Sequence, residues 1–143
     1  MKIKVSQLEG TALDWAVAKC EYGERKSNHG LPIVKIDGPW AIYFAPHANA
    51  YRQNDYIRFL PTHDWSQGGP IIEREQIEVS PWNTRSAPNK KYLFEATDWR
   101  ARSLQLVLHD AEGFVAPTPL IAAMRCYVAS KLGDEVDVPD ELR

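Results

Sequence analysis

The sequence lacks the residue patterns that metal sites and covalent catalysis require. Its two cysteines are far apart in the chain and its four histidines are scattered, so neither type has the spacing of a metal site. Neither a Gly-x-Ser-x-Gly motif nor a Gly-rich phosphate loop ending in Lys-Ser or Lys-Thr is present. We therefore expect no metal ion, no cofactor and no nucleophile–base pair.

Long apolar runs and an excess of basic residues are also missing. No stretch approaches the length that crosses a bilayer, and the N-terminus lacks the apolar run of a signal peptide, so we expect a cytosolic protein with no membrane partner. The formal net charge of −2 argues against a nucleic-acid partner, because such binding needs a basic face. The length of 143 residues predicts a single domain, 1–143, that can bury a core. A homo-oligomer is compatible with all of these features.

The hydrophobic pattern predicts an α+β fold. Helical spacing indicates a first helix from about Leu8 or Thr11 to Glu21, begun by a Ser6–Glu9 capping box, and a short helix from Pro70 to about Gln76. Branched and aromatic residues indicate strands at Lys2–Val5, Trp40–Phe44, Tyr56–Leu60, Ile77–Trp82 and around Val136–Val138. The stretches Tyr92–Thr97 and Trp99–Leu108 are expected to supply one or two more strands. Pro46–Asp55 and Ser86–Lys91 are expected to be loops. The sum is a mostly antiparallel, aromatic-rich sheet packed with two main helices and one short helix, in which the first and last strands can pair.

The last helix has the clearest boundaries. Thr118 can cap its start, Pro119 fits its first turn and Gly133 follows its last turn. Arg125, the only charge in its middle, either reaches solvent along its stem or pairs with a ligand. Trp15 is the exception on the first helix because it lies opposite the main apolar stripe, near Lys19. It either packs under a loop or lines a ligand cleft, and we predict that Trp15 and Arg125 approach the same cleft.

The segment DWSQGGPIIERE, residues 64–75, is the most informative part of the sequence. Proline is favoured at the first helical position, and glycines before it leave the backbone open to close approach. The segment therefore predicts a helix that begins at Pro70, with bare N–H groups that can receive an anion. Trp65 offers a stacking face and Gln67 an amide. The alternative is a tight turn whose Trp65 fills the core.

The same segment, together with ALDWAVAKCE at residues 12–21 and PTPLIAAMRCYVASKLGDEV at residues 117–136, resembles the phage NinX-like family. These are small proteins of tailed phages and prophages, mostly of unknown function. The three blocks lie at both ends and in the middle, so the resemblance spans most of the chain. Two regions, Lys26–Tyr56 and Ser80–Gly113, depart from the family pattern. The resemblance implies a genomic setting and assigns no chemistry.

Three functions fit these observations. The first is a non-catalytic protein that sequesters a host immune nucleotide of the ADP-ribose type in the cytoplasm of the infected bacterium, a hypothesis by analogy with other phage proteins. We expect its binding residues to be Trp15, Asp64, Trp65, Gln67, Gly68, Gly69, Pro70, Ile71, Arg74 and Arg125. The second is an enzyme that cleaves such a nucleotide, with His63, Asp64 or Glu73 activating water. The third is a phage adaptor protein, marked by an exposed apolar patch without a pocket.

Overall fold

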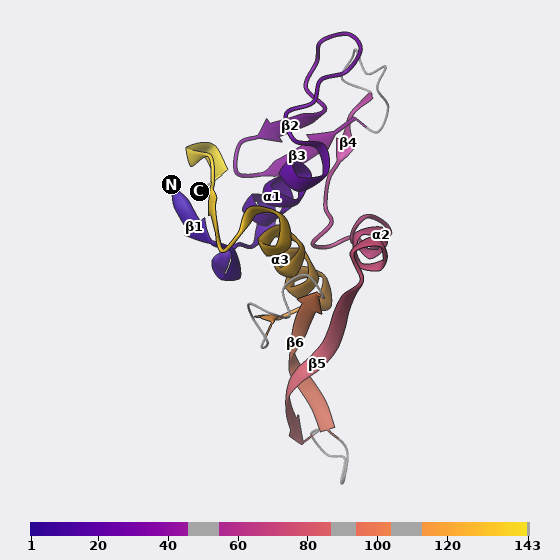
Figure 1. Ribbon diagram of the computed structural model, residues 1–143, viewed down its shortest axis with the longest axis vertical. Coiled ribbons are helices and arrows are strands. Elements are labelled where there is room, and N and C mark those ends of the chain that lie inside the picture. The colour runs from indigo at the N-terminus through magenta and orange to yellow at the C-terminus, as the bar shows by residue number, and fades with distance from the viewer. Residues whose placement is uncertain (46–54, 87–93, 104–112, 143) are drawn as a thin grey trace.

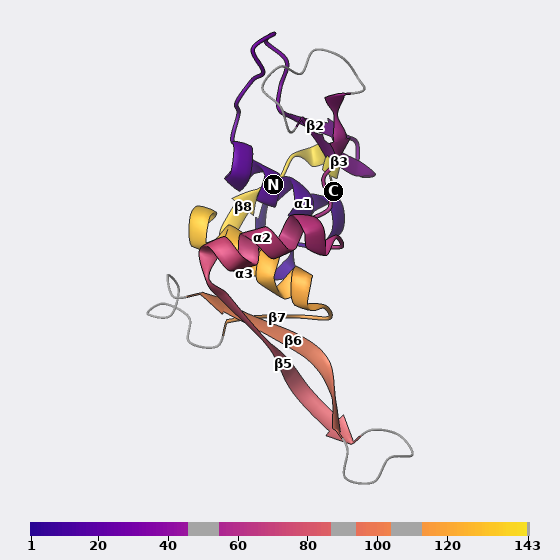
Figure 2. The same cartoon turned by 90° about the vertical axis from the view of Figure 1, so that its right-hand side faces the viewer.

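Three α-helices pack together at the centre of the protein and supply half of the buried residues of its main core (Figure 1). They are α1 (Gly10–Tyr22), α2 (Trp65–Glu75) and α3 (Pro119–Leu132). The structure, a computed structural model, describes residues 1–45, 55–86, 94–103 and 113–142. Helix α3 contacts both other helices, and Figure 2 shows it beside α2 above the strands that α3 also covers.

Helix α3 is buried on nearly all sides, which explains why its sequence is apolar around most of its circumference. Every residue from Ala122 to Ala129 is buried. The Thr118 hydroxyl oxygen accepts a hydrogen bond of 3.2 Å from the Ile121 N–H, and Gly133 ends the helix with a φ of 88°. A positive φ favours glycine, so the predicted cap and stop are both confirmed.

Helix α1 confirms its predicted span, but its N-terminus differs from the prediction. Leu13, Ala16 and Val17 are fully buried on the predicted stripe. The Ser6–Glu9 capping box is wrong, because Val5–Gln7 forms a 3-10 turn (η1) instead. Glu9 occupies the cap position and no side chain caps the helix.

The strands confirm the α+β class, and they divide among three small antiparallel sheets instead of joining one. Strand β1 (Lys2–Lys4) pairs with β8 (Glu135–Asp137), as the sequence suggested for the first and last strands. The second sheet contains β2 (Val34–Asp37), β3 (Ala41–Phe44) and β4 (Ile57–Arg58). The helices lie between the second and third sheets (Figure 1). A 3-10 turn, η3 (Asp140–Leu142), follows β8.

The third sheet is dominated by a long hairpin that extends away from the helices (Figure 1). Its strands are β5 (Ile77–Ser86) and β6 (Phe94–Ser103), and β7 (Phe114–Ala116) adds to β6 near the body. The sequence left open whether Tyr92–Thr97 and Trp99–Leu108 form one strand or two, and within the described residues one strand continues through Asp98. The predicted loops at Pro46–Asp55 and Ser86–Lys91 fall largely in residues 46–54 and 87–93, outside the described residues.

Helix α2 begins five residues earlier than predicted. The Asp64 side chain caps it by accepting a hydrogen bond of 2.9 Å from the Ser66 N–H, so Gly68, Gly69 and Pro70 lie inside the helix. The prediction of a helix start at Pro70 with free N–H groups is therefore wrong. A residue before proline is normally driven out of the helical region by a clash with its own Cβ. Gly69 has no Cβ, which lets the helix continue into Pro70.

Gly68 serves packing. It is buried, and a methyl group there would collide with the carbonyl oxygen of Pro61 and lie 2.7 Å from Leu120 Cδ2 of α3. The absent side chain therefore lets α2 approach both the preceding turn and α3.

Gly68→Ala should lower the free energy of unfolding by about 1–3 kcal/mol, because overpacking forces α2 away from these neighbours. Urea denaturation measures the change. Glu73→Ala, at an exposed position of the same helix, is the control and should stay within about 0.5 kcal/mol of the parent. Equal stability of Gly68→Ala and the parent would contradict the close approach.

Candidate functional site

The arginines predicted to bind phosphate are both engaged in intramolecular contacts. Arg74 forms an ion pair with Glu21 through two hydrogen bonds, and its guanidinium also lies 3.3 Å from the Tyr127 hydroxyl. Arg125 is only 7% exposed. It donates from Nε to the Leu8 carbonyl at 2.7 Å and from Nη1 to the Val115 carbonyl at 3.1 Å. Burial lowers the pKa of Arg125, and the charge of Glu9 acts in the opposite direction.

Most of the predicted binding residues in α2 also have structural roles. Gln67 bridges to the chain before α2: its Oε1 accepts from the Leu60 N–H at 2.5 Å and its Nε2 donates to the Arg58 carbonyl at 2.9 Å. Ile71 is buried in the core. Trp65 is 55% exposed and lies over Gly69, so it does not fill the core. It also does not line the cleft that Trp15 forms with β2.

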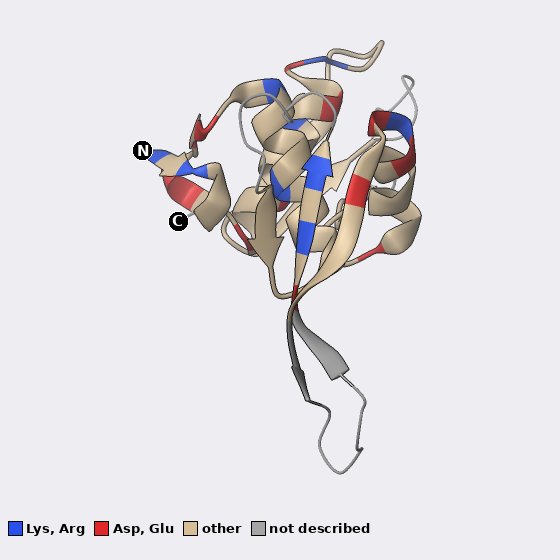
Figure 3. Ribbon diagram, turned by 60° about the horizontal axis from the view of Figure 1, so that its bottom comes forward, with Lys and Arg blue, Asp and Glu red and all other residues tan. Residues whose placement is uncertain are grey.

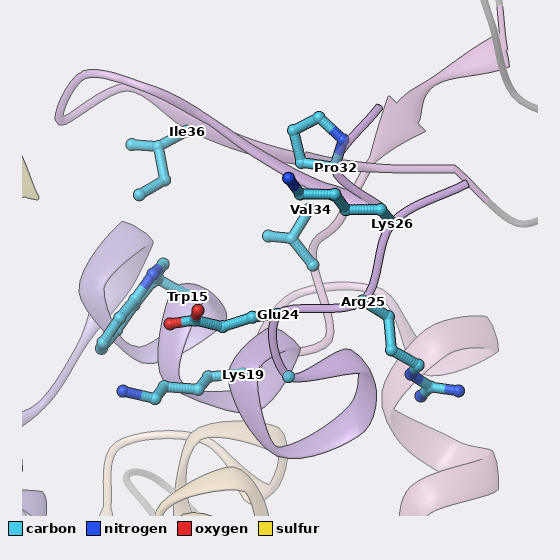
Figure 4. A pocket seen from close by; sticks show the side chains of 9 residues that line it. Trp15, Lys19, Glu24, Arg25, Lys26, Pro32, Val34 and Ile36 are labelled. Atoms are coloured by element: carbon cyan, nitrogen blue, oxygen red, sulfur yellow. The ribbon is translucent and has the colours of Figure 1, made fainter. Parts of the chain in front are cut away.

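A cleft of about 290 Å³ lies between α1 and β2, and Trp15 forms one wall (Figure 4). Trp15, Lys19 and Gly23 are spaced four residues apart and so fall on one side of the end of α1. Val34 and Ile36 of β2 face them, and Pro32 lies above. The sequence-based alternative that Trp15 lines a cleft is therefore the one observed. Among the predicted binding residues, all of which the structure describes, Trp15 alone lines it.

Charged side chains surround the apolar walls of this Trp15 cleft. The Lys19 ammonium lies 5.2 Å from the centre of the Trp15 ring. Lys26 and Glu24 also line the cleft, and neither side chain forms a hydrogen bond or ion pair within the described part of the chain. The Arg25 guanidinium points away from Trp15 and donates to the Tyr22 and Glu21 carbonyls (Figure 4).

The loop after α1 is ordered by its own backbone and builds one side of the cleft. Gly23 ends α1 with a φ of 58°, which turns the chain toward β2. The Arg25 carbonyl accepts from the Ile33 N–H at 3.0 Å, and Lys26 pairs with Pro32 in an isolated bridge. The Ser27 hydroxyl oxygen accepts from the His29 and Leu31 N–H groups, each at 3.2 Å. Sequence reasoning missed Lys19, Glu24 and Lys26; the position of Lys19 near Trp15 was noted, whereas Glu24 and Lys26 follow the end of α1 and carried no helical signal.

The prediction that Trp15 and Arg125 approach the same cleft is wrong. The Arg125 guanidinium does not line the Trp15 cleft, because it donates to the carbonyls of Leu8, just after η1, and of Val115 in β7. Its partners are main-chain oxygens, which ties α3 to two other segments.

Arg125→Lys should lower the free energy of unfolding by about 1–3 kcal/mol, because an ammonium group cannot reproduce the planar fork that reaches two carbonyls. Chemical denaturation measures this. Arg102→Lys, in a hairpin ion pair with Glu78, is the control and should change stability by less than about 0.5 kcal/mol. An unaffected Arg125→Lys protein would show that these two bonds carry little of the fold.

The acid–base residues of the enzyme hypothesis do not line the Trp15 cleft. Asp64 accepts from both the Ser66 N–H and the Ser66 hydroxyl. His63 is exposed, with Nδ1 2.9 Å from the Thr62 hydroxyl, which donates to buried Asp14 at 2.8 Å. Glu73 lies on the exposed side of α2. Burial raises the pKa of Asp14 from 3.8 to about 6, and its hydrogen bonds with Thr62 offset only part of that effect.

This raised pKa of Asp14 makes stability depend on pH. The folded protein binds the Asp14 proton more tightly than the unfolded chain, so the contribution is greatest below about pH 4 and declines as pH rises toward 6. Asp14→Asn should remove that decline, with a difference in slope of up to about 1.4 kcal/mol per pH unit. Urea denaturation between pH 4 and 7 tests it, and parallel profiles for the two proteins would contradict it.

Comparison with known families places these features in a wider group. The family described as Bacteriophage P22, NinX, matches residues 4–131. A search of curated proteins finds no match. Within the described residues, no helix has the length and apolar character needed to cross a membrane. The match covers α1, α2, all of α3 but its last residue, and the residues that line the Trp15 cleft, and the chain belongs to this phage NinX family.

Proposed function

We propose that this phage protein binds a phosphorylated nucleotide in the Trp15 cleft and releases it chemically unchanged. The observation that supports the proposal best is an aromatic wall beside two lysines in an apolar cleft. A nucleobase stacks on an indole, and ammonium groups pair with phosphate oxygens. Lys26 has no competing partner in the described part of the chain, so it is available to a ligand.

The dimensions of the cleft favour a small ligand. Its volume of about 290 Å³ lies at the lower end of the usual range for ligand sites, about 300–1,000 Å³. A base and ribose would lie between Trp15 and β2, with phosphate at the open rim beside the lysines. A larger hollow of about 640 Å³ beside Asp134 and Glu135 suits phosphate less well because two carboxylates line it.

The charge distribution favours a free nucleotide over a nucleic acid. Figure 3 shows basic and acidic segments interspersed on the helices and strands in view. A polynucleotide groove needs a continuous basic track, whereas a mononucleotide needs only the two lysines at one cleft.

The phage family suggests a biological role. A protein that retains a nucleotide without altering it can lower the free concentration of a host signal, and we propose that it acts in this way in the cytoplasm of the infected bacterium. Glu24 is the one carboxylate among the described residues of the cleft, and no histidine lines it. A cleft lined by a single carboxylate and no histidine supports ligand binding in preference to hydrolysis.

The proposal is tested by calorimetry of the purified chain against AMP, GMP, linear and cyclic ADP-ribose, and cyclic dinucleotides. Each mixture is then denatured and the ligand mass is measured. Binding with an unchanged ligand supports the proposal. Heat from none of these ligands at tens of micromolar protein would overturn it for the panel, and an altered ligand mass would favour the enzyme hypothesis.

Trp15→Leu should weaken binding about tenfold or more, because the leucine keeps apolar packing and removes the stacking face, worth about 1–3 kcal/mol per base. Trp65→Leu is the matched control, since Trp65 is also helical and lies outside the cleft. Its affinity should equal that of the parent. Loss of binding in Trp65→Leu alone would move the site to the start of α2.

A further inference from the structure

Glu24 is a carboxylate in a cleft that otherwise suits an anion. It follows Gly23 at the end of α1, and Figure 4 shows its side chain directed toward Trp15. Lys19, Arg25 and Lys26 line the same cleft, yet none of them forms an ion pair with Glu24. A carboxylate placed among cations without pairing to them is available to accept hydrogen bonds from a ligand.

The chemistry of a carboxylate discriminates between the two purine bases. An ionised carboxylate only accepts hydrogen bonds and can accept two in parallel. The pairing edge of guanine presents two adjacent donors, the N1–H and the 2-amino group. The pairing edge of adenine presents one donor, the 6-amino group, beside the N1 acceptor, which a carboxylate repels. Proteins that read an exposed base use this edge.

We infer that the Trp15 cleft selects guanine nucleotides over adenine nucleotides, with the Glu24 carboxylate accepting both guanine donors while the base stacks on Trp15. This inference rests on the proposed nucleotide binding and specifies its base. It differs from the ADP-ribose-type ligand suggested by analogy. A cationic ligand for Glu24 is disfavoured, because Lys19, Arg25 and Lys26 outnumber the single carboxylate in the cleft.

Calorimetry with GMP, IMP and AMP tests the base preference in the intact chain. IMP keeps the N1–H of guanine and lacks the 2-amino group, so it removes one of the two proposed bonds. We expect GMP to bind most tightly, AMP to bind about tenfold or more weakly, and IMP to lie between them, because one bidentate contact to a base contributes a discrimination of this order.

Glu24→Gln provides the decisive variant. A glutamine amide offers one donor and one acceptor, which match adenine N1 and its 6-amino group. This variant should lose about tenfold in GMP affinity and gain affinity for AMP, whereas Glu141→Gln, at an exposed position in η3, should leave both affinities unchanged.

The outcomes separate the inference from the proposed function. AMP binding as tight as GMP binding in the parent, or an unchanged preference in Glu24→Gln, overturns the guanine assignment while nucleotide binding stands. Absence of binding by all three nucleotides overturns the guanine assignment, and it overturns nucleotide binding as well if the ADP-ribose and cyclic dinucleotide ligands also give no heat. A circular dichroism spectrum of Glu24→Gln that matches the parent shows that the fold is retained, as expected for an exposed side chain.

Discussion

The hydrogen bonds that the Glu21 carboxylate accepts are the interactions on which the arrangement of the three helices depends. From the end of α1 it accepts hydrogen bonds from Arg74 of α2 and from the Tyr127 hydroxyl of α3, the latter at 2.7 Å. Burial alone would raise the pKa of Glu21, but these two hydrogen bonds and the charges of Arg74 and Arg25 together outweigh burial and hold the pKa below its usual value. A Glu75–Lys131 pair at 2.9 Å also joins α2 to α3. Because the Arg74 and Lys131 side chains are more than a third exposed, water screens both ion pairs, and each contributes about 1 kcal/mol or less.

This contact connects the family framework to the candidate site. The three sequence blocks that resemble the NinX family supply one partner each, Glu21, Arg74 and Tyr127, and they meet only in the folded protein. Because Glu21 is fixed, the chain leaves α1 in a defined direction, and Arg25 reinforces it by donating to the Glu21 carbonyl. Glu24 and Lys26 are thereby held beside Trp15. The opposite wall, β2, also lies inside the residues 4–131 that the family matches, so the helix framework and the candidate site fall in the same matched stretch.

Short-range sequence patterns predicted the helix limits and side-chain positions that short-range interactions determine. The limits of α3 follow from Thr118 and Gly133, and the position of Trp15 opposite the apolar stripe left a cleft as one of two alternatives. The roles of arginines and glycines were mispredicted because their partners are distant in sequence. Arg125 donates to Leu8, which is 117 positions away, and Gly68 is required by contacts with Pro61 and Leu120. The expectation that proline marks a helix start failed at Pro70, because that expectation describes only a preference. Gly69 and the Asp64 cap together outweigh this preference and place Pro70 inside α2.

The proposed nucleotide binding and the proposed guanine preference both require that the Trp15 cleft is the ligand site. The most direct measurement is a titration of the ¹⁵N-labelled protein with GMP, followed through the indole N–H signals of its five tryptophans. Each indole reports its own surroundings, and single Trp→Phe variants assign the signals. If GMP binds in the Trp15 cleft, we predict a saturable shift of the Trp15 signal with little change at Trp40 and Trp65. A shift confined to Trp65, or unchanged indole signals up to millimolar GMP, would contradict it.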